Sequence, residues 1–112
     1  MESNKQEPLL TIIIPVYNAA GTIERTLRSL LRLAPENRAC VEVVLVNDGC
    51  NDDSSTIIRA TAERHHDWSW NIIDQSNQGL SGARNAALSA ARGRWIFFLD
   101  ADDELATDLV PC

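Results

Sequence analysis

The segment LLTIIIPV, residues 9–16, is a continuous apolar run rich in β-branched residues. A run of this kind is typical of a strand that is buried on both faces, as in a parallel sheet. Pro15 marks its end, and residues 18–33 then show the spacing of an amphipathic helix. The apolar stripe of this predicted helix consists of Ile23, Leu27, Leu30 and Leu31. The segment therefore predicts the first strand-helix unit of an α/β fold.

Strand and helix patterns alternate along the rest of the chain. Further strands are predicted over residues 41–47, 68–75 and 94–100, and further helices over residues 53–66 and 83–92. This alternation predicts a Rossmann-like domain of three layers, α/β/α, in which a mainly parallel sheet lies between helices. We expect its crossovers to be right-handed. The chain divides into a flexible leader, residues 1–8, and one domain, residues 9–112.

Composition and charge exclude several classes of protein. The length of 112 residues suits one domain, and a chain that is 45% hydrophobic and 23% charged has the composition of a soluble globular protein. A net charge of −6 argues against a nucleic-acid binder, because such proteins usually present a basic patch. The longest apolar runs are far shorter than the roughly 20 residues of a membrane helix, and the polar start does not resemble a signal peptide.

The cysteines indicate the compartment. Cys40, Cys50 and Cys112 are odd in number and do not have the spacing of metal ligands. A reducing compartment is the simpler interpretation. We therefore expect a cytoplasmic protein, or one that a longer parent chain holds at the cytoplasmic face of the membrane.

Polar and small residues follow each predicted strand. These strand ends are residues 15–18, 47–49, 77–79 and 100–103. In open α/β sheets, ligands bind just outside the carboxyl ends of the strands. Because the fold brings all four strand ends to one edge of the sheet, the sequence predicts a ligand site there.

The segment FFLDADDE, residues 97–104, brings four acidic side chains to the last of these strand ends. If the strand stays extended through Asp102, the side chains of Asp100 and Asp102 point to the same side and repel each other. A divalent cation would remove this conflict, and oxygen ligands select Mg²⁺ or Mn²⁺, whose remaining ligands are often substrate phosphates. The alternative is that these acids cap a helix that starts near Ala106 and remain solvated.

Four other residues are candidates for the same site. Asp48 follows a buried strand and could accept the N–H and hydroxyl groups of a nucleoside, while Gly49 allows a sharp turn; the alternative is a common Asp-Gly turn. Tyr17 could stack on a base ring or simply cover the end of the sheet. Arg84 falls in the first turn of its predicted helix, where the helix dipole disfavours a cation. We therefore expect an anionic partner for Arg84, either a diphosphate or a nearby aspartate.

Taken together, these segments resemble the family 2 glycosyltransferases, which have the GT-A fold. The resemblance covers residues 10–109 and rests on four segments in order: TIIIPVYNA, VEVVLVNDGCNDDS, NQGLSGARNAAL and ARGRWIFFLDADDE. It implies the N-terminal half of a GT-A domain. It also implies transfer of a sugar from a nucleotide-diphosphate sugar with the help of Mg²⁺ or Mn²⁺. A UDP-sugar is the first candidate for this donor. The acceptor would be the hydroxyl of an unknown sugar or of a lipid-linked molecule.

The resemblance also implies roles for individual residues. The implied nucleotide-sugar site consists of Pro15, Tyr17, Asp48, Gly49, Arg84 and Asp100, and the implied metal site consists of Asp102 and Asp103. Pro15 and Tyr17 would border the nucleobase, and Asp48 would contact it. Asp100 would face the ribose. Arg84 would contact the diphosphate or brace the acidic loop.

Two departures from the family pattern matter. The family often has D-D-G-S after the second strand, whereas residues 47–50 read N-D-G-C. In addition, family members continue well beyond the acidic run, and nothing in this chain matches the general base that inverting members use. We expect that base beyond Cys112, so that the chain would be truncated at its C-terminus and inactive or weakly active alone.

Two further hypotheses come from other classes of protein. A phospho-accepting receiver-like signalling domain has a similar size and similar acids, but it needs acids after the first strand, where this chain has residues 15–18, PVYN. It also needs a lysine near a late strand end, and the only lysine is Lys5. The other hypothesis is a non-catalytic remnant that only binds nucleotide.

Overall fold

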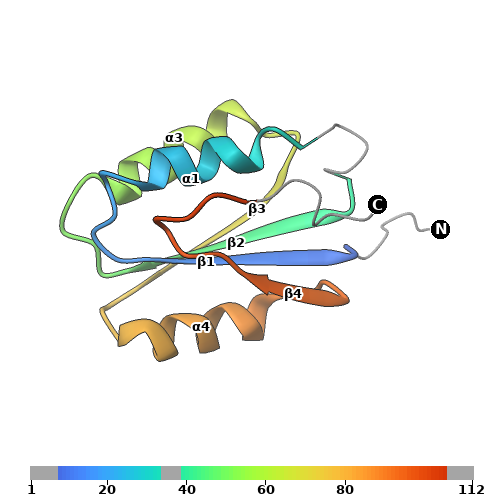
Figure 1. Ribbon diagram of the computed structural model, residues 1–112. Helices are drawn as coiled ribbons and strands as arrows, with labels where there is room; N and C mark the ends of the chain where they lie inside the picture. The colour runs from blue at the N-terminus through green and yellow to red at the C-terminus, as the bar shows by residue number, and fades with distance from the viewer. Residues whose placement is uncertain (1–7, 34–38, 106–112) are drawn as a thin grey trace.

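The computed structural model describes residues 8–33 and 39–105, in which strands and helices alternate (Figure 1). In chain order the elements are β1 Leu10–Val16, α1 Ile23–Leu30, β2 Val41–Asp48, α3 Ser54–Arg64, β3 Ser69–Gln75, α4 Gly79–Ala90 and β4 Trp95–Phe98. All strand pairs are parallel, and the strand order is β3-β2-β1-β4. The predicted three-layer parallel α/β fold is therefore confirmed. The predicted leader, apart from Pro8, and the helix considered near Ala106 lie outside the described residues.

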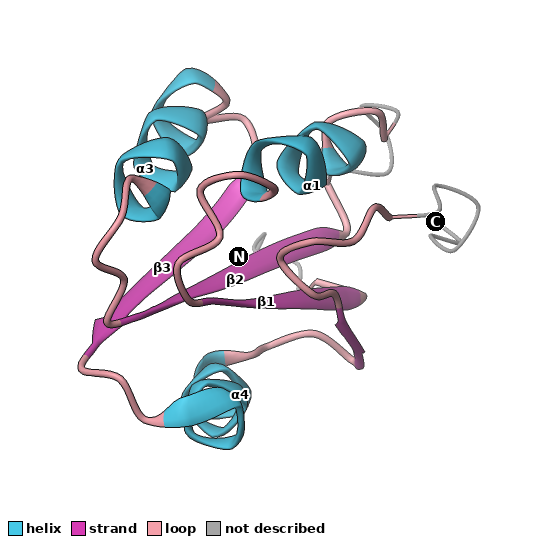
Figure 2. Cartoon of the chain, turned by 60° about the vertical axis from the view of Figure 1, so that its left-hand side comes forward, coloured by secondary structure: helices cyan, strands magenta, loops and turns pink. Residues whose placement is uncertain are grey.

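The sheet separates two apolar cores. Helices α1 and α3 cover one face and α4 covers the other (Figure 2). Because successive side chains of a strand point to opposite faces, Ile12 and Ile14 pack toward α1, whereas Ile13 packs with Ala83 and Ala87 of α4. The central strands β1 and β2 are thus buried on both faces, as their apolar runs predicted. Within the described residues, no helix has the length and apolar character needed to cross a membrane.

The last strand differs from its prediction. The sequence predicted a strand over residues 94–100, but β4 extends only from Trp95 to Phe98 and forms an edge of the sheet, paired with β1. Trp95 is 65% exposed, and Ile96 and Phe98 are also exposed. An apolar run therefore predicted the strand correctly but not its burial, because burial depends on which neighbours the sheet supplies.

Helix α4 begins earlier than predicted. It starts at Gly79 rather than at residue 83, which places Arg84 in its second turn. The carboxylate of Asp48 accepts the backbone N–H groups of Gln78, at 2.9 Å, and of Gly79, at 3.1 Å. These N–H groups lie at the start of a helix and need an acceptor from outside it. The argument that the helix dipole disfavours Arg84 therefore does not apply, because that effect is confined to the first turn.

A buried carboxylate fixes the other end of the sheet. Glu42 of β2 is 2% exposed and accepts hydrogen bonds from the Thr11 hydroxyl at 3.0 Å, from the Arg92 backbone N–H at 2.8 Å and from Arg92 Nε at 2.9 Å. The backbone N–H of Gly93 donates to Thr11 Oγ1 at 2.8 Å. A Cβ atom on Gly93 would lie 2.4 Å from Thr11 Oγ1, so only glycine allows this approach. This network sets where the chain enters β4.

Candidate functional site

The loops that follow β1 and β2 are joined by hydrogen bonds. The thiol of Cys50 lies 3.3 Å from the Val16 carbonyl and accepts the Asn18 backbone N–H at 3.4 Å. The side-chain carbonyl of Asn18 accepts the Asn51 backbone N–H at 2.7 Å. Tyr17 lies between Val16 and Asn18 in the sequence, so these contacts hold it at the carboxyl ends of the strands. Cys50 therefore links the two loops.

Asp48 lies in a cavity of about 200 Å³ at the end of β2. The cavity is lined by Pro15, Val16, Tyr17, Asp48, Asn77, Gly79, Leu80 and Ala83. Asp48 is 3% exposed, and besides the two backbone N–H groups it accepts a hydrogen bond from the side-chain amide of Gln75 at 2.9 Å. A carboxylate has about four acceptor positions. The three hydrogen bonds that Asp48 accepts, from Gln75, Gln78 and Gly79, therefore leave about one position for a ligand.

Gly49 forms the turn next to this cavity. Its φ angle is +73°, and a Cβ atom there would lie 2.7 Å from the backbone nitrogen of Asn77. The predicted sharp turn is present. The segment that approaches the glycine closely is the loop before α4, which the sequence did not reveal.

A second cavity, of about 380 Å³, adjoins the first at Pro15 and Tyr17. It is lined by Pro15, Tyr17, Asn18, Ala19, Thr22, Ala101 and Asp102. Tyr17 is 53% exposed. One aromatic side chain thus borders both the cavity that contains Asp48 and the cavity that contains Asp102.

The acidic run forms a tight turn. One carboxylate oxygen from each of Asp100, Asp102 and Asp103 lies within 4.8 Å of the others, and all three residues are exposed. The Asp103 backbone N–H donates to the Asp100 carbonyl at 3.0 Å. Because β4 already ends at Phe98, the carboxylates meet through this turn and not through the side-chain alternation of an extended strand. Three exposed oxygen ligands at this spacing suit a hard cation such as Mg²⁺ or Mn²⁺.

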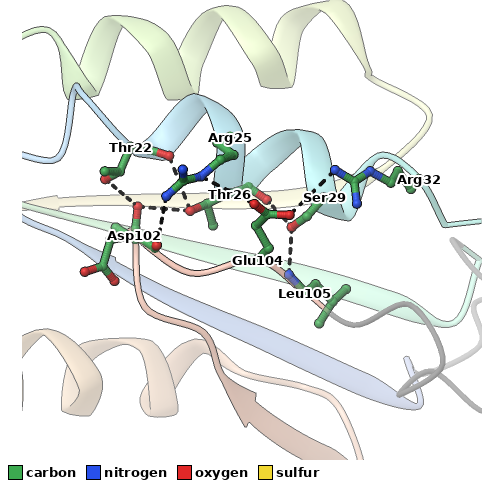
Figure 3. Close-up of polar contacts among 9 residues, drawn as sticks. Thr22, Arg25, Thr26, Ser29, Arg32, Asp102, Glu104 and Leu105 are labelled. Carbon is green, nitrogen blue, oxygen red and sulfur yellow. Dashed lines mark hydrogen bonds and ion pairs between the residues drawn. The ribbon is translucent and has the colours of Figure 1, made fainter.

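The fourth acid of the run has a different environment. The Glu104 carboxylate pairs with Arg25 of α1 at 3.5 Å and with Arg32, just after α1, at 3.7 Å (Figure 3). Within the described part of the chain, the group of close carboxylates does not include Glu104. The structure therefore separates one acid from the other three, which sequence spacing did not do.

Comparisons with known proteins identify the family. The sequence model described as Glycosyl transferase family 2 matches residues 11–111. The chain belongs to glycosyltransferase family 2. The uncharacterized glycosyltransferase EpsJ from Bacillus subtilis is 43% identical over 100 residues, which cover 89% of this chain and 28% of EpsJ. These findings support the glycosyltransferase interpretation and not the receiver-like or remnant alternatives.

Solved glycosyltransferases share the fold. A mannosyltransferase, PcManGT from Pyrobaculum calidifontis, in complex with GDP-Man and Mn²⁺, has a TM-score of 0.84 and 31% identity, and the match covers 93% of this chain and 30% of that protein. TarS residues 1–349 from S. aureus, in complex with UDP-GlcNAc, has a TM-score of 0.76 and 26% identity over 89% of this chain and 28% of that one. The GT-A fold is therefore confirmed. The chain spans less than a third of the length of these proteins.

Arg84 stacks on a side chain of β4. Its guanidinium carbon lies 5.2 Å from the ring centroid of Phe98, two residues before Asp100, a distance that is typical of a cation-π contact. Its Nε atom is buried and has no hydrogen-bond partner within the part of the chain that the structure describes. Among the described residues, no aspartate is hydrogen-bonded to this atom.

Asn47 is the first residue of the segment N-D-G-C, which departs from the expected family pattern. Its side-chain amide donates to Asp74 at 3.0 Å, and its side-chain oxygen accepts the Cys50 backbone N–H at 3.2 Å. The Asn47 amide is the main cause that lowers the pKa of Asp74, with the Arg59 guanidinium as a further cause. The side chain at position 47 thus connects the strand ends, and Asp48 is the carboxylate in the cavity.

Asp52 lies two residues before the start of α3 and contacts it. Its carboxylate accepts the Ser54 backbone N–H at 2.9 Å and the Ala20 backbone N–H at 3.1 Å. Hydrogen bonds from Ser54, through its side chain and its backbone, lower the pKa of Asp52 below its ordinary value. The Asp52 side chain therefore accepts a backbone N–H at the start of α3, although Asp53 occupies the N-cap position.

Sequence reasoning did not assign several residues to the site. Leu80 and Thr22 line the cavities, and the hydroxyls of Thr22, Thr26 and Ser29 contact the segment after β4. A signal for the hydroxyls is present in the sequence. They recur at i, i+4 and i+7, beside the apolar stripe of the same helix.

Proposed function

We propose that this chain is the part of a family 2 glycosyltransferase that binds the sugar donor. The donor would be a nucleotide-diphosphate sugar that binds together with Mg²⁺ or Mn²⁺. A UDP-sugar is the first candidate. The whole protein would transfer the sugar to a hydroxyl of a sugar or lipid-linked acceptor. A cytoplasmic location belongs to this proposal, because a nucleotide-sugar donor would be available there.

The arrangement of the two adjoining cavities carries the proposal. Tyr17 and Pro15 line both, with Asp48 in one and Asp102 in the other. A nucleotide sugar has a flat base with N–H groups at one end and a charged diphosphate between its ribose and its sugar. The aromatic ring and acceptor in the first cavity suit the base, and the carboxylates beside the second suit a cation that binds a diphosphate.

Individual roles follow from the chemistry of these residues. Tyr17 would stack on the base, with Pro15 beside it, and Asp48 would accept a base N–H at its remaining acceptor position. Gly49 would keep the turn that holds the adjoining loops. Asp100 would face the ribose, and Arg84 would offer its buried N–H to the diphosphate or brace the acidic turn.

Asp102 and Asp103 would hold the cation, with Asp100 close to both. Their oxygen atoms are hard ligands, and their exposure leaves room for phosphate oxygens and water. The cation, when bound, supplies positive charge that stabilises the nucleoside diphosphate as it leaves. PcManGT was solved with GDP-Man and Mn²⁺, which supports a divalent cation at this site.

The acceptor half and the general base would lie in the remainder of a longer protein. The matches cover only 28–30% of the relatives named above. Transfer to a hydroxyl requires a group that accepts its proton. We therefore expect the 112-residue chain to bind a nucleotide weakly and to transfer little or no sugar. Normal turnover by this chain alone would contradict this division of labour.

Calorimetric titration with UDP, in Mn²⁺ and in EDTA, tests the proposal. Binding should be tighter in Mn²⁺, and Asp102→Asn should weaken it by about tenfold or more in Mn²⁺ with little change in EDTA, because a charged ligand contributes roughly 1.5–3 kcal/mol. Glu104→Gln is the matched control, since its carboxylate pairs with arginines. Tyr17→Ala should weaken binding in both buffers. Binding that is indifferent to Mn²⁺ in the wild-type chain would reject the proposed function.

A further inference from the structure

Helix α1 presents a stripe of hydroxyl groups to the acidic turn. Thr22 at the N-cap of α1 and Thr26 and Ser29 within it occupy positions i, i+4 and i+7, and all three contact the segment after β4 (Figure 3). We propose that Thr22 and Thr26 are positioning residues of the cation site, which hold the acidic turn in its binding arrangement through the carbonyl of Ala101. This inference rests on the proposed function.

Both threonines donate to one carbonyl oxygen. Thr22 Oγ1 lies 2.9 Å and Thr26 Oγ1 lies 3.0 Å from the Ala101 carbonyl oxygen. Each hydroxyl carries one proton and also lies near a carbonyl close in sequence, at 3.3 Å for Ala19 and 3.4 Å for Thr22. The shorter distances favour the bonds to Ala101. The two lone pairs of that oxygen are then both used, which fixes the peptide between Asp100 and Asp102.

A further hydrogen bond holds the segment that follows β4 at Leu105, just after the acidic residues. Ser29 Oγ accepts the Leu105 backbone N–H at 2.8 Å and lies 2.6 Å from the Thr26 carbonyl. Leu105 is 4% exposed and packs in the core below α1. The run from Ala101 to Leu105 is thus held at both ends by hydroxyls of one helix.

The hydroxyl contacts are more deeply buried than the neighbouring ion pair of Arg25 with Glu104. Thr26 and Ser29 are fully buried, whereas Arg25 and Glu104 have side chains that are 57% and 45% exposed. Exposed ion pairs contribute little because water screens them. The hydroxyl contacts, which are buried at Ser29 and partly buried at Ala101, are therefore less screened by water and restrain the turn more strongly.

The restraint has a consequence for cation binding. Asp100, Asp102 and Asp103 repel one another when no cation is present, which favours an open turn. A turn that is held closed by α1 does not need to be ordered when the cation arrives, so less free energy is lost on binding. Loss of either threonine hydroxyl should weaken the site without removing any carboxylate.

Mn²⁺ titration of the full chain, followed by the electron paramagnetic resonance signal of free Mn²⁺, tests this role. Thr22→Val and Thr26→Val keep the side-chain shape and remove the hydroxyl. Each should weaken Mn²⁺ binding by about three- to tenfold, the effect of one lost neutral hydrogen bond, and the double variant should be weaker still. Thr26→Ser restores a hydroxyl and should restore affinity. Thr61→Val is the control, because Thr61 Oγ1 bonds only within α3, to the Ile57 carbonyl at 2.9 Å.

Hydrogen exchange of the metal-free chain provides a second measurement. The backbone N–H of Asp103 bonds within the turn, and its exchange should accelerate several-fold in both valine variants but not in Thr61→Val. Wild-type Mn²⁺ affinity in Thr22→Val and Thr26→Val, at a temperature where both are folded, would overturn the positioning role even if their melting temperatures fall. Failure of the wild-type chain to bind Mn²⁺ would instead overturn the proposed function.

Discussion

The carboxylate of Asp48, at the end of β2, accepts the backbone N–H of Gly79, at the start of α4, at 3.1 Å across 31 residues of sequence. A negative charge at this position also interacts favourably with the positive end of the helix dipole. One side chain thus caps a helix from another element while it borders the candidate site. Its structural role and its proposed ligand role are therefore coupled.

Replacement of Asp48 by asparagine tests this coupling. Both carboxylate oxygens face N–H donors, so the amide NH₂ of Asp48→Asn must meet a donor. We expect a loss of about 2–3 kcal/mol in the free energy of unfolding, the range for hydrogen bonds to a charged group, and faster exchange at the Gly79 amide. Urea denaturation and exchange mass spectrometry measure the two effects. Glu63→Gln makes the same chemical change on the exposed face of α3 and should leave both values unchanged.

Two glycines form a matched pair. Gly49→Ala should destabilise the chain by more than about 1 kcal/mol, because its φ of +73° is unfavourable for alanine and a Cβ would meet the Asn77 nitrogen at 2.7 Å. Gly21→Ala should be neutral or slightly stabilising, because no heavy atom lies within 4 Å of its Cβ position. Thermal melting compares the two variants. Equal melting temperatures would show that the turn at Gly49 relaxes without cost.

The buried carboxylate of Glu42 should contribute strongly to stability. Glu42→Ala leaves the Thr11 hydroxyl and the Arg92 backbone N–H without their acceptor at the start of β4. We expect the free energy of unfolding to fall by about 2–4 kcal/mol. This loss is smaller than that for a fully buried ion pair, because the Arg92 side chain is 59% exposed. Glu24→Ala removes the exposed pair of Glu24 with Arg28 and should cost less than about 0.5 kcal/mol. Similar losses in both variants would contradict the assigned role of burial.

Acid should reduce the contribution of Asp74 to stability. The pKa of Asp74 is lowered below its ordinary value of 3.8, first by the Asn47 amide and then by Arg59. A lowered folded-state pKa stabilises the fold above the ordinary value, and this contribution is lost as the pH falls through the folded-state pKa. Because both Arg59 and Asp74 are about half exposed, Asp74→Asn should cost less than about 1 kcal/mol at pH 7.

A pH series of urea denaturation curves checks the sign. The stability difference between the wild-type chain and Asp74→Asn should shrink as the pH falls below 3.8. In an Asn47→Ala background the difference should be smaller throughout, because the main cause of the lowered pKa is gone. A difference that stays constant from pH 7 to acid would refute the linkage.

The acidic run shows how far local sequence could predict the site. Its position after an apolar run correctly placed Asp100, Asp102 and Asp103 at the end of a strand. The predicted reason for their proximity, an extended strand through Asp102, was wrong, since a turn gathers them after Phe98. Spacing alone also gave no way to separate Glu104, whose partners are Arg25 of α1 and Arg32 just after α1.

The sequence by itself determined the order of the elements, the parallel sheet and the residue types at its carboxyl edge. Hydrophobic periodicity and turn residues act over a few positions, so they can be read without knowing any distant contact. Only the tertiary structure decided that Asp48 caps α4, that β4 is an exposed edge and that the hydroxyls of α1 hold Ala101. These features depend on atoms that are 30 to 79 residues apart in the chain, and only the packed fold brings such atoms within hydrogen-bonding distance.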